Sequence, residues 1–210
     1  TVTDANGCTD TEDIDVEVFA LPMPTIAIAE TSGLANNDGN LCAGDDLTLT
    51  ASDPDPMTTF EWLLPDGSVV TATGLNITNI DNTFSGVYTV TADNNGCTNT
   101  ATVTITVNDP PDPEIQFMGD PANFNICEDE AFNLDVVTTM GTGPFTYSWT
   151  LPNGTTGSGN PYSVAMADPA IHQGVWVVTV TDANGCTGTD NIGVTVDPAP
   201  TNNSCATAAD

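Results

Sequence analysis

Three segments of the chain share one alternating pattern of apolar and polar positions. In each, three aliphatic residues are separated by single polar residues, and the three copies align without a gap. Strict alternation is the pattern of a β-strand with one buried face and one wet face, so we expect three equivalent strands. The aliphatic positions are Ile14, Val16 and Val18; Val103, Ile105 and Val107; and Ile192, Val194 and Val196.

A further strand and a tight turn precede two of these segments. The strands are expected at Val87–Thr91 and Val175–Thr181, and the turns at Asp-Asn-Asn-Gly (93–96) and Asp-Ala-Asn-Gly (182–185). Asn-Gly is typical of β-hairpin turns because both residues tolerate positive φ. Proline cannot donate to a sheet and would end each alternating strand; it follows them as Pro22, Pro110 and Pro198.

The turn belongs to a longer repeat. The octapeptide TVTDANGC stands at residues 1–8 and again at 179–186, and a related copy occupies 91–97. The cysteines of the three copies, Cys8, Cys97 and Cys186, recur at intervals of 89 residues. A fixed period of this length indicates tandem copies of one small domain. Short strands without a helical period predict an all-β fold of tandem antiparallel Ig-like β-sandwich modules.

The repeat also predicts how the chain is divided. We expect modules at 19–108 and 109–197, each with an early cysteine (Cys42 or Cys127) before its tryptophan strand. Residues 1–18 would be the final hairpin of a preceding module, or a donor strand for a neighbouring subunit. Residues 198–210 would be a linker and the start of a following module. The chain could thus be a whole subunit or a window on a longer polypeptide.

Charge excludes several classes of function. The 210 residues contain no Lys or Arg and 29 Asp plus Glu, which gives a net charge of −29. Without basic residues the chain has no phosphate clamp, and a nucleic acid would be repelled. An anionic membrane surface is disfavoured for the same reason. No apolar stretch approaches the roughly 20 residues that a membrane span needs, so we expect no direct membrane insertion.

The segment from Trp176 to Asp190, followed by an alternating strand and Pro-Ala-Pro, resembles a known family. It is similar to PKD-like and Ig-like repeats of large Bacteroidota cell-surface proteins, including adhesins associated with gliding motility. The resemblance covers nearly the whole chain. It implies an extracellular, non-enzymatic β-sandwich used as a spacer, adhesin stalk or surface filament, and it brings no catalytic residues.

Six cysteines in a chain of this composition predict disulfides formed in an oxidising place outside the cytoplasm. The expected bridges join Cys42 to Cys97 and Cys127 to Cys186, one within each module; buried free thiols are the alternative. Cys8 and Cys205 have no partner inside the modules. They would be free, or bonded to another module or subunit.

Other polar residues offer weaker candidates. Calcium needs six to eight oxygen ligands, and acidic pairs could supply some of them, although solvated acids are the simpler interpretation. Asn76 and Asn153 fit the N-glycosylation sequon. The acidic candidates are Asp45 with Asp46, Asp109 with Asp112, Asp53 with Asp55, and Asn37-Asp38-Gly39.

The remaining candidates favour structure over catalysis. His172 is the single histidine and has no Ser or Cys nucleophile in view, so we expect a loop residue. Trp62, Trp149 and Trp176 could stack on sugars, but their strand context predicts core positions. We therefore expect a non-catalytic surface stalk or filament whose partners are adjacent modules or other copies of the chain. The alternatives are an adhesin that binds glycan or another surface, and an accessory module of a secreted enzyme.

Overall fold

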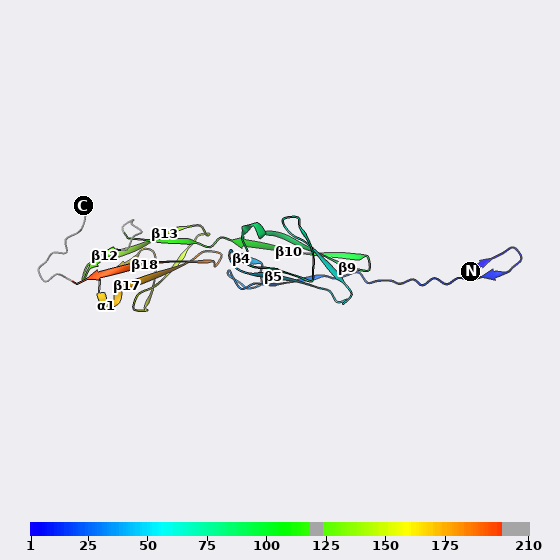
Figure 1. Ribbon diagram of the computed structural model, residues 1–210, viewed down its shortest axis with the longest axis horizontal. Helices are drawn as coiled ribbons and strands as arrows, with labels where there is room; N and C mark the ends of the chain where they lie inside the picture. Colours follow the sequence, from blue (N-terminus) through cyan, green and yellow to red (C-terminus); the bar gives the residue numbers. More distant parts are fainter. Residues whose placement is uncertain (118–123, 199–210) are drawn as a thin grey trace.

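The computed structural model describes residues 1–117 and 124–198. Two β-sandwiches lie end to end and form a rod, and the N-terminal segment extends from one end of it (Figure 1). Within the described residues, secondary structure other than strands amounts to two single turns, η1 (Asn82–Phe84) and α1 (Pro169–His172).

The first sandwich consists of a five-stranded and a three-stranded sheet. The five-stranded sheet has the order β4 (Asn40–Cys42), β10 (Cys97–Asn108), β9 (Gly86–Asn94), β6 (Thr59–Leu63) and β7 (Val69–Thr71). The three-stranded sheet has the order β3 (Thr25–Ala29), β5 (Leu47–Ser52) and β8 (Gly74–Ile77).

The second sandwich repeats this arrangement strand for strand. Its larger sheet has the order β12 (Phe124–Cys127), β18 (Thr187–Asp197), β17 (Gly174–Thr181), β14 (Thr146–Thr150) and β15 (Thr156–Ser158). Its smaller sheet has the order β11 (Asp112–Gln116), β13 (Phe132–Thr139) and β16 (Tyr162–Val164). The predicted all-β fold of tandem sandwiches is confirmed.

One parallel pair in each sandwich fixes where the early cysteine lies. β4 runs parallel to β10 and β12 runs parallel to β18, whereas the other paired strands are antiparallel. The last residue of the short strand faces the last residues of its long partner: Cys42 pairs with Asn108, and Cys127 pairs with Asp197. Each early cysteine is therefore at the end of the sandwich where the final strand leaves it.

The tryptophans are core residues, as their strand context predicts. Trp62, Trp149 and Trp176 are completely buried, so they are not surface platforms for sugars. Each indole N–H donates to a backbone carbonyl oxygen, so the one polar atom of each buried ring has a hydrogen-bond partner. Tyr88 is buried in the equivalent place to Trp176, and both donate to the carbonyl four residues earlier.

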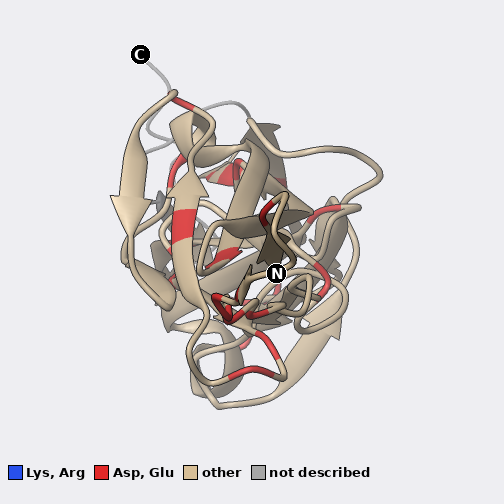
Figure 2. Ribbon diagram, turned by 90° about the vertical axis from the view of Figure 1, so that its right-hand side faces the viewer, with Lys and Arg blue, Asp and Glu red and all other residues tan. Residues whose placement is uncertain are grey.

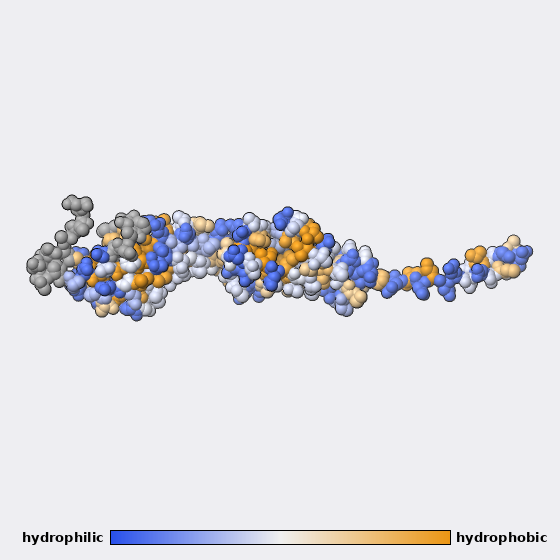
Figure 3. Space-filling model, in the orientation of Figure 1, coloured by the Kyte–Doolittle hydropathy of each residue, from blue (hydrophilic) through white to orange (hydrophobic). Residues whose placement is uncertain are grey.

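The N-terminal segment departs from the prediction. Residues 1–10 form a small hairpin of β1 (Val2–Thr3) and β2 (Thr9–Asp10), but residues 11–24 form no strand. Their alternating aliphatic residues are exposed because no neighbouring strand is present to pair with them: Ile14 is 85% exposed and Val18 is 87% exposed. Figure 3 shows this part as a thin segment with apolar atoms on its surface, beside the thicker body of the sandwiches.

Candidate functional site: the junction between the sandwiches

A disulfide joins the two sandwiches. Cys42, at the end of β4, is bonded to Cys186, in the turn between β17 and β18, although the two residues are 144 positions apart. The sulfur atoms are 2.05 Å apart and the Cα atoms 5.5 Å apart. The bond therefore ties the exit end of the first sandwich to a hairpin of the second.

The predicted pairing of Cys42 with Cys97 is wrong. Cys97 begins β10 and Cys42 lies beside its last residue, so the length of a 12-residue strand separates them. At about 3.3 Å per residue that is roughly 36 Å, far beyond the Cα separation of about 5.5 Å that a disulfide requires.

The same geometry excludes the predicted bond between Cys127 and Cys186, because β18 lies between them and Cys127 pairs with its last residue, Asp197. Cys127 is nevertheless disulfide-bonded. Cys8 and Cys97 are free thiols, the first exposed and the second half-buried. Cys205 lies outside the described residues.

The hairpin of the second sandwich packs directly on a loop of the first. Gly185, at its tip, has φ of +82°, and a Cβ there would come within 2.9 Å of the backbone of Gly33 and Leu34. A Cβ on Gly33 would in turn lie 3.4 Å from the carbonyl oxygen of Asn184. The lack of a side chain at Gly185 therefore lets the two backbones approach closely.

A buried carboxylate shapes the loop that receives this hairpin. Glu30 is only 4% exposed. Its two oxygens accept hydrogen bonds from the backbone N–H groups of Asp38 and Ser32, at 2.9 and 3.0 Å. The Ser32 hydroxyl accepts the N–H of Cys42. Glu30 thus holds residues 32–38 in the shape that presents Cys42 to the second sandwich, a role that no sequence pattern signalled.

The linker is held against the second sandwich as well. Pro111 is buried, and its carbonyl oxygen lies so close to Gly188 that a Cβ there would be 1.9 Å away. Asp182, which is 5% exposed, accepts the N–H groups of Asn184 and Cys186 with one oxygen and that of Thr142 with the other. The repeated Asp-x-Asn-Gly-Cys motif therefore builds the hairpin and also anchors it beside the junction.

An open hollow of about 420 Å³ lies at this junction. The first sandwich supplies Asn82, Ser85, Val107 and Asn108 to its wall. The linker and the second sandwich complete it with Asp109, Met140, Gly141 and Thr142. Its lining has no titratable group besides Asp109, so it offers no catalytic constellation.

The candidate calcium ligands are not gathered into a site. Within residues 1–117 and 124–198, no three His, Cys, Asp or Glu side chains form a group that could hold a metal. Asp46 accepts the N–H of Asn79, and Asp112 accepts the hydroxyl of Thr139. Asp109 lines the junction hollow, and Asp45 donates its N–H to the carbonyl oxygen of Cys42. These acids have structural partners or face solvent, and calcium stays a prediction.

The remaining acidic candidates also serve as local structure. Asp53 accepts hydrogen bonds from Asp55, Met23 and Thr58. The backbone N–H of Asp55 is the largest of the effects that lower the pKa of Asp53 below its ordinary value. The side chain of Asp38 accepts a hydrogen bond from the backbone N–H of Asn40, and Asn37 adopts a left-handed conformation with φ of +63°.

The two sequon asparagines are on the surface. Asn76 is exposed on β8, and its amide oxygen accepts the hydroxyl of Thr48. Asn153 is exposed in the turn after Leu151 and accepts both the N–H and the hydroxyl of Thr155. Both positions are accessible, and their glycosylation stays a prediction.

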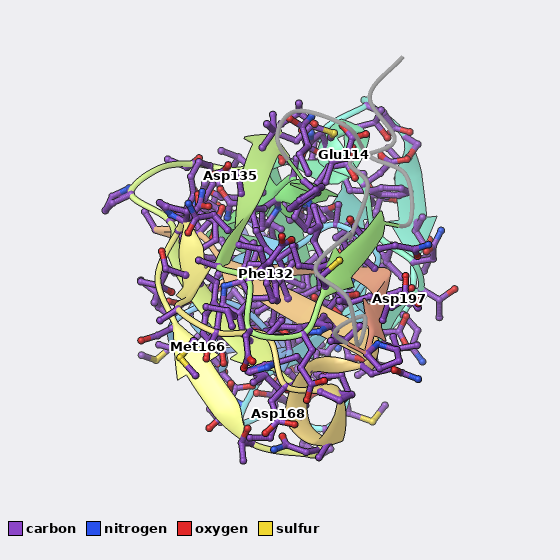
Figure 4. The ribbon with its side chains drawn as sticks, turned by 90° about the vertical axis from the view of Figure 1, so that its left-hand side faces the viewer. Glu114, Phe132, Asp135, Met166, Asp168 and Asp197 are labelled. Carbon is purple, nitrogen blue, oxygen red and sulfur yellow. A yellow bond between two sulfur atoms is a disulfide. The ribbon has the colours of Figure 1, made fainter. Side chains whose placement is uncertain are left out.

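The single histidine has a structural environment. Its Nδ1 accepts the N–H of Asp168 at 2.8 Å, and its ring stacks on Trp176 with centroids 5.8 Å apart. Phe132 meets both rings edge-on. These contacts lie at the end of the second sandwich that faces away from the first (Figure 4), where Phe132 is central and Asp168 and Asp197 lie around it.

No helix in the described part of the chain is long and apolar enough to cross a membrane. The end view in Figure 2 shows acidic residues on several strands and turns and no basic residue to pair with them.

Comparison with known proteins finds a family model that matches part of the chain. Residues 30–111 match the family model described as "Ig-like domain CHU_C associated". This part of the chain is an Ig-like domain. The second sandwich has the same strand order, so the chain carries two Ig-like β-sandwiches in tandem. Ig-like domains are generally structural or adhesion modules.

Several solved structures of tandem Ig domains are similar to this chain. An eight-domain fragment of Down Syndrome Cell Adhesion Molecule has 16% identity and a TM-score of 0.48, with 84% of this chain and 25% of that one covered. A titin I-band fragment has 13% identity and a TM-score of 0.47, with 86% and 67% covered. A two-domain fragment of DIP-gamma has 14% identity and a TM-score of 0.40, with 83% and 98% covered. No curated protein sequence matches the chain.

Proposed function

We propose that the chain is part of an extracellular, non-catalytic stalk or filament in which Ig-like modules are fixed end to end by disulfides. The observation that carries the proposal is the bond between Cys42 and Cys186. A bridge inside one domain stabilises that domain, whereas this one fixes the relation between two. Tandem domains joined only by a short linker are expected to move relative to each other unless their interface is large and apolar.

Composition and family support the same location. Disulfides persist in oxidising surroundings outside the cytoplasm. The matched family and the resemblance to repeats of large Bacteroidota surface proteins both favour the cell surface. A net charge of −29 with no basic residue would keep neighbouring rods apart at low salt.

Electron microscopy of the purified chain tests the mechanical part of the proposal. The oxidised protein should give straight particles with a narrow distribution of angles between the sandwiches. A Cys42→Ser/Cys186→Ser double variant should give a broad distribution, while a Cys8→Ser variant should match the parent. Equal distributions in all three would contradict the proposal. Antibodies to the folded chain should also label intact cells of its source, and labelling only after permeabilisation would count against a surface role.

The main rival is an adhesin that binds glycan. A glycan array separates the two, because a spacer should show no binding and an adhesin should show a defined set of hits.

A further inference from the structure

We infer that Cys97 is one half of a second disulfide between modules. Its partner would be the early cysteine of a preceding Ig-like module, of which residues 1–18 form the last hairpin and strand. "Early cysteine" here means the position that Cys42 and Cys127 occupy, beside the end of the final strand of their own sandwich. The inference concerns an interface and does not depend on what the rod is used for.

The first observation is that Cys97 occupies the position of the bonded Cys186. Both follow an Asn-Gly turn, and they are 89 residues apart. The sulfur of Cys186 lies 4.0 Å from the carbonyl oxygen of Asn108, and the sulfur of Cys97 lies 3.9 Å from the carbonyl oxygen of Phe19. Asn108 and Phe19 are also 89 residues apart, so the two contacts are equivalent.

This equivalence locates the missing partner. At the observed junction, Asn108 is the residue that pairs with Cys42, and its carbonyl oxygen accepts the N–H of Ala43. Phe19 stands where Asn108 stands. An early cysteine paired with Phe19 would therefore face Cys97 as Cys42 faces Cys186.

The linker that enters the first sandwich is already seated as the observed linker is. Pro22 and Pro111 are equivalent, and both are buried. Where the carbonyl oxygen of Pro111 approaches Gly188, that of Pro22 accepts a hydrogen bond of 2.9 Å from the side chain of Asn99. The docking geometry is therefore present on the first sandwich without a module in front of it.

The three repeat cysteines differ in burial because different numbers of neighbouring segments cover them. Cys186 is 1% exposed, because a linker and a loop of the neighbouring sandwich lie over it. Cys97 has only the linker and is half-buried, and Cys8 has neither and is exposed. The tip of the hairpin follows the same order: Gly185 is half-buried against Gly33, whereas Gly96 is exposed. Cys97 thus lacks one specific layer, the one that the loop of residues 32–42 provides to Cys186.

The hollow at the junction has an incomplete counterpart at this end. A smaller depression of about 160 Å³ is lined by the incoming chain, Ala20 to Met23, together with Asn94 and residues 53–55. Two of these residues, Ala20 and Asp53, lie 89 positions before Asp109 and Thr142 of the 420 Å³ hollow. Asn82 and Ser85 of the observed junction have no equivalent in the described residues at this end, and Val18, which aligns with Val107, does not line the depression.

The segment just before the linker shows what kind of module would supply them. Ile14, Val16 and Val18 align with three core residues of the second sandwich, Ile192, Val194 and Val196, whose exposure is 4% or less. In the N-terminal segment the same positions are at least 77% exposed. A sandwich that takes residues 9–18 as its last strand would bury them, and its early cysteine would then lie beside Phe19.

Bond formation balances as an ordinary thiol oxidation. The thiol of Cys97 and the thiol of the early cysteine form one sulfur–sulfur bond and release two protons and two electrons. A disulfide oxidant, such as oxidised glutathione, takes up both and is reduced to two thiols.

A series of such bridges would have a mechanical consequence. From Cys97 the chain follows β10, the linker, β11 and β12, and reaches Cys127 after 30 residues, having crossed both sandwiches. Thirty residues span at most about 100 Å when fully extended, and two strand lengths already use roughly 70 Å. Bridges at both cysteines would therefore leave a covalent path with little slack, and unfolding could hardly lengthen the rod.

A fusion that completes the preceding module tests the inference. Residues 109–178 are placed before residue 1, so that residues 1–8, which are identical to 179–186, continue the added sequence in register. The added segment brings one early cysteine, a second copy of Cys127. Parent and fusion are oxidised with glutathione, labelled with N-ethylmaleimide without reduction, and mapped by mass spectrometry after cleavage at acidic residues.

We expect Cys97 to be labelled in the parent and at least tenfold less labelled in the fusion, while Cys8 is labelled in both. The matched control is the same fusion with Cys127→Ser in the added segment only, which should restore labelling of Cys97. Protection of Cys8 instead of Cys97 would mean that the early cysteine bonds within its own module, and would overturn the inference. Linkage of Cys97 between two chains would overturn it as well.

A second fusion guards against a failure to fold. It places residues 19–90 before residue 1, so that Tyr88 takes the place of Trp176 and the added early cysteine is Cys42, within a different core sequence. Cooperative unfolding of the added module with protected Cys97 supports the inference. If neither fusion folds its added module, residues 1–18 do not complete a sandwich of this kind, and the inference fails at its premise.

Discussion

Cys42 and Cys186 are bonded across the junction of two Ig-like sandwiches, and the bond closes a loop of 144 positions. The loop contains most of both sandwiches, so the bonded ends of the two sandwiches cannot move apart while the bond is intact. The lack of a side chain at Gly185 allows the backbones beside the bond to touch. The covalent link and the packed contact therefore act at the same place.

Removing the bridge should lower stability. In the chain-entropy model a cross-link that closes a loop of this size stabilises the native state by at most about 5 kcal/mol. The full effect requires both sandwiches to unfold, because only then is the whole loop an unfolded chain. We expect the Cys42→Ser/Cys186→Ser double variant to have a lower midpoint in guanidinium unfolding than the parent. The Cys8→Ser variant, which changes an exposed thiol outside the sandwiches, is the control. An unchanged midpoint in the double variant would show that the bridge does not stabilise the native state.

The contact at the hairpin tip can be separated from the conformation of the hairpin. Gly185 and Gly96 have nearly the same φ, +82° and +89°, but a Cβ on Gly96 would meet nothing within 4 Å. Gly96→Ala should therefore cost only the left-handed conformation, roughly 1 kcal/mol. Gly185→Ala should cost clearly more, because its Cβ meets backbone that cannot move aside. Unfolding of both variants in denaturant measures the difference, and equal costs would argue against the packed junction.

Much of the fold could be predicted from the sequence, since it depends on patterns local to each strand. Alternation located the last strands, Asn-Gly located the hairpins, and aromatic residues in apolar strands located the core tryptophans. Each of these signals is decided by neighbours within a few residues. Residues 11–18 show the limit of such a signal. Alternation shows that a segment can pair as a strand, but it does not show whether a partner strand is present.

The junction could not be predicted, because a repeat hides which copy a residue touches. Early cysteines and hairpin cysteines recur once per module, so pairing within one module and pairing with the next give the same pattern in sequence. The length of β10 decides between them, since it places Cys42 and Cys97 at opposite ends. Glu30 gave no signal either: a single glutamate in an acidic chain looks solvated until its burial is seen.

Acid should weaken the seat of the incoming linker. Hydrogen bonds hold the pKa of Asp53 below its ordinary value. The donors are the backbone N–H of Asp55, which has the largest effect, the backbone N–H of Met23 and the hydroxyl of Thr58. A carboxyl whose folded pKa is depressed adds stability above its unfolded pKa, about 3.9, and that contribution is lost as pH falls through the folded value. As the pH is lowered from 4, the free energy of unfolding of the Asp53→Asn variant should therefore fall less than that of the parent. Asp13→Asn, in the exposed N-terminal segment, should behave as the parent, and a parallel loss in all three would rule out this role.

Pulling on the ends of the chain should reveal the bridge directly. A load applied at residues 1 and 210 passes through the bond between Cys42 and Cys186, so the residues between them carry no tension. Reduction places at least 144 more positions under load, which adds about 500 Å of contour length at roughly 3.5 Å per residue. Single-molecule force spectroscopy under oxidising and reducing conditions measures this gain. A Cys8→Ser/Cys97→Ser variant, which lacks both free thiols, should show the same gain. Full extension under oxidising conditions would mean that the junction is not covalently closed and that the rod is held by packing alone.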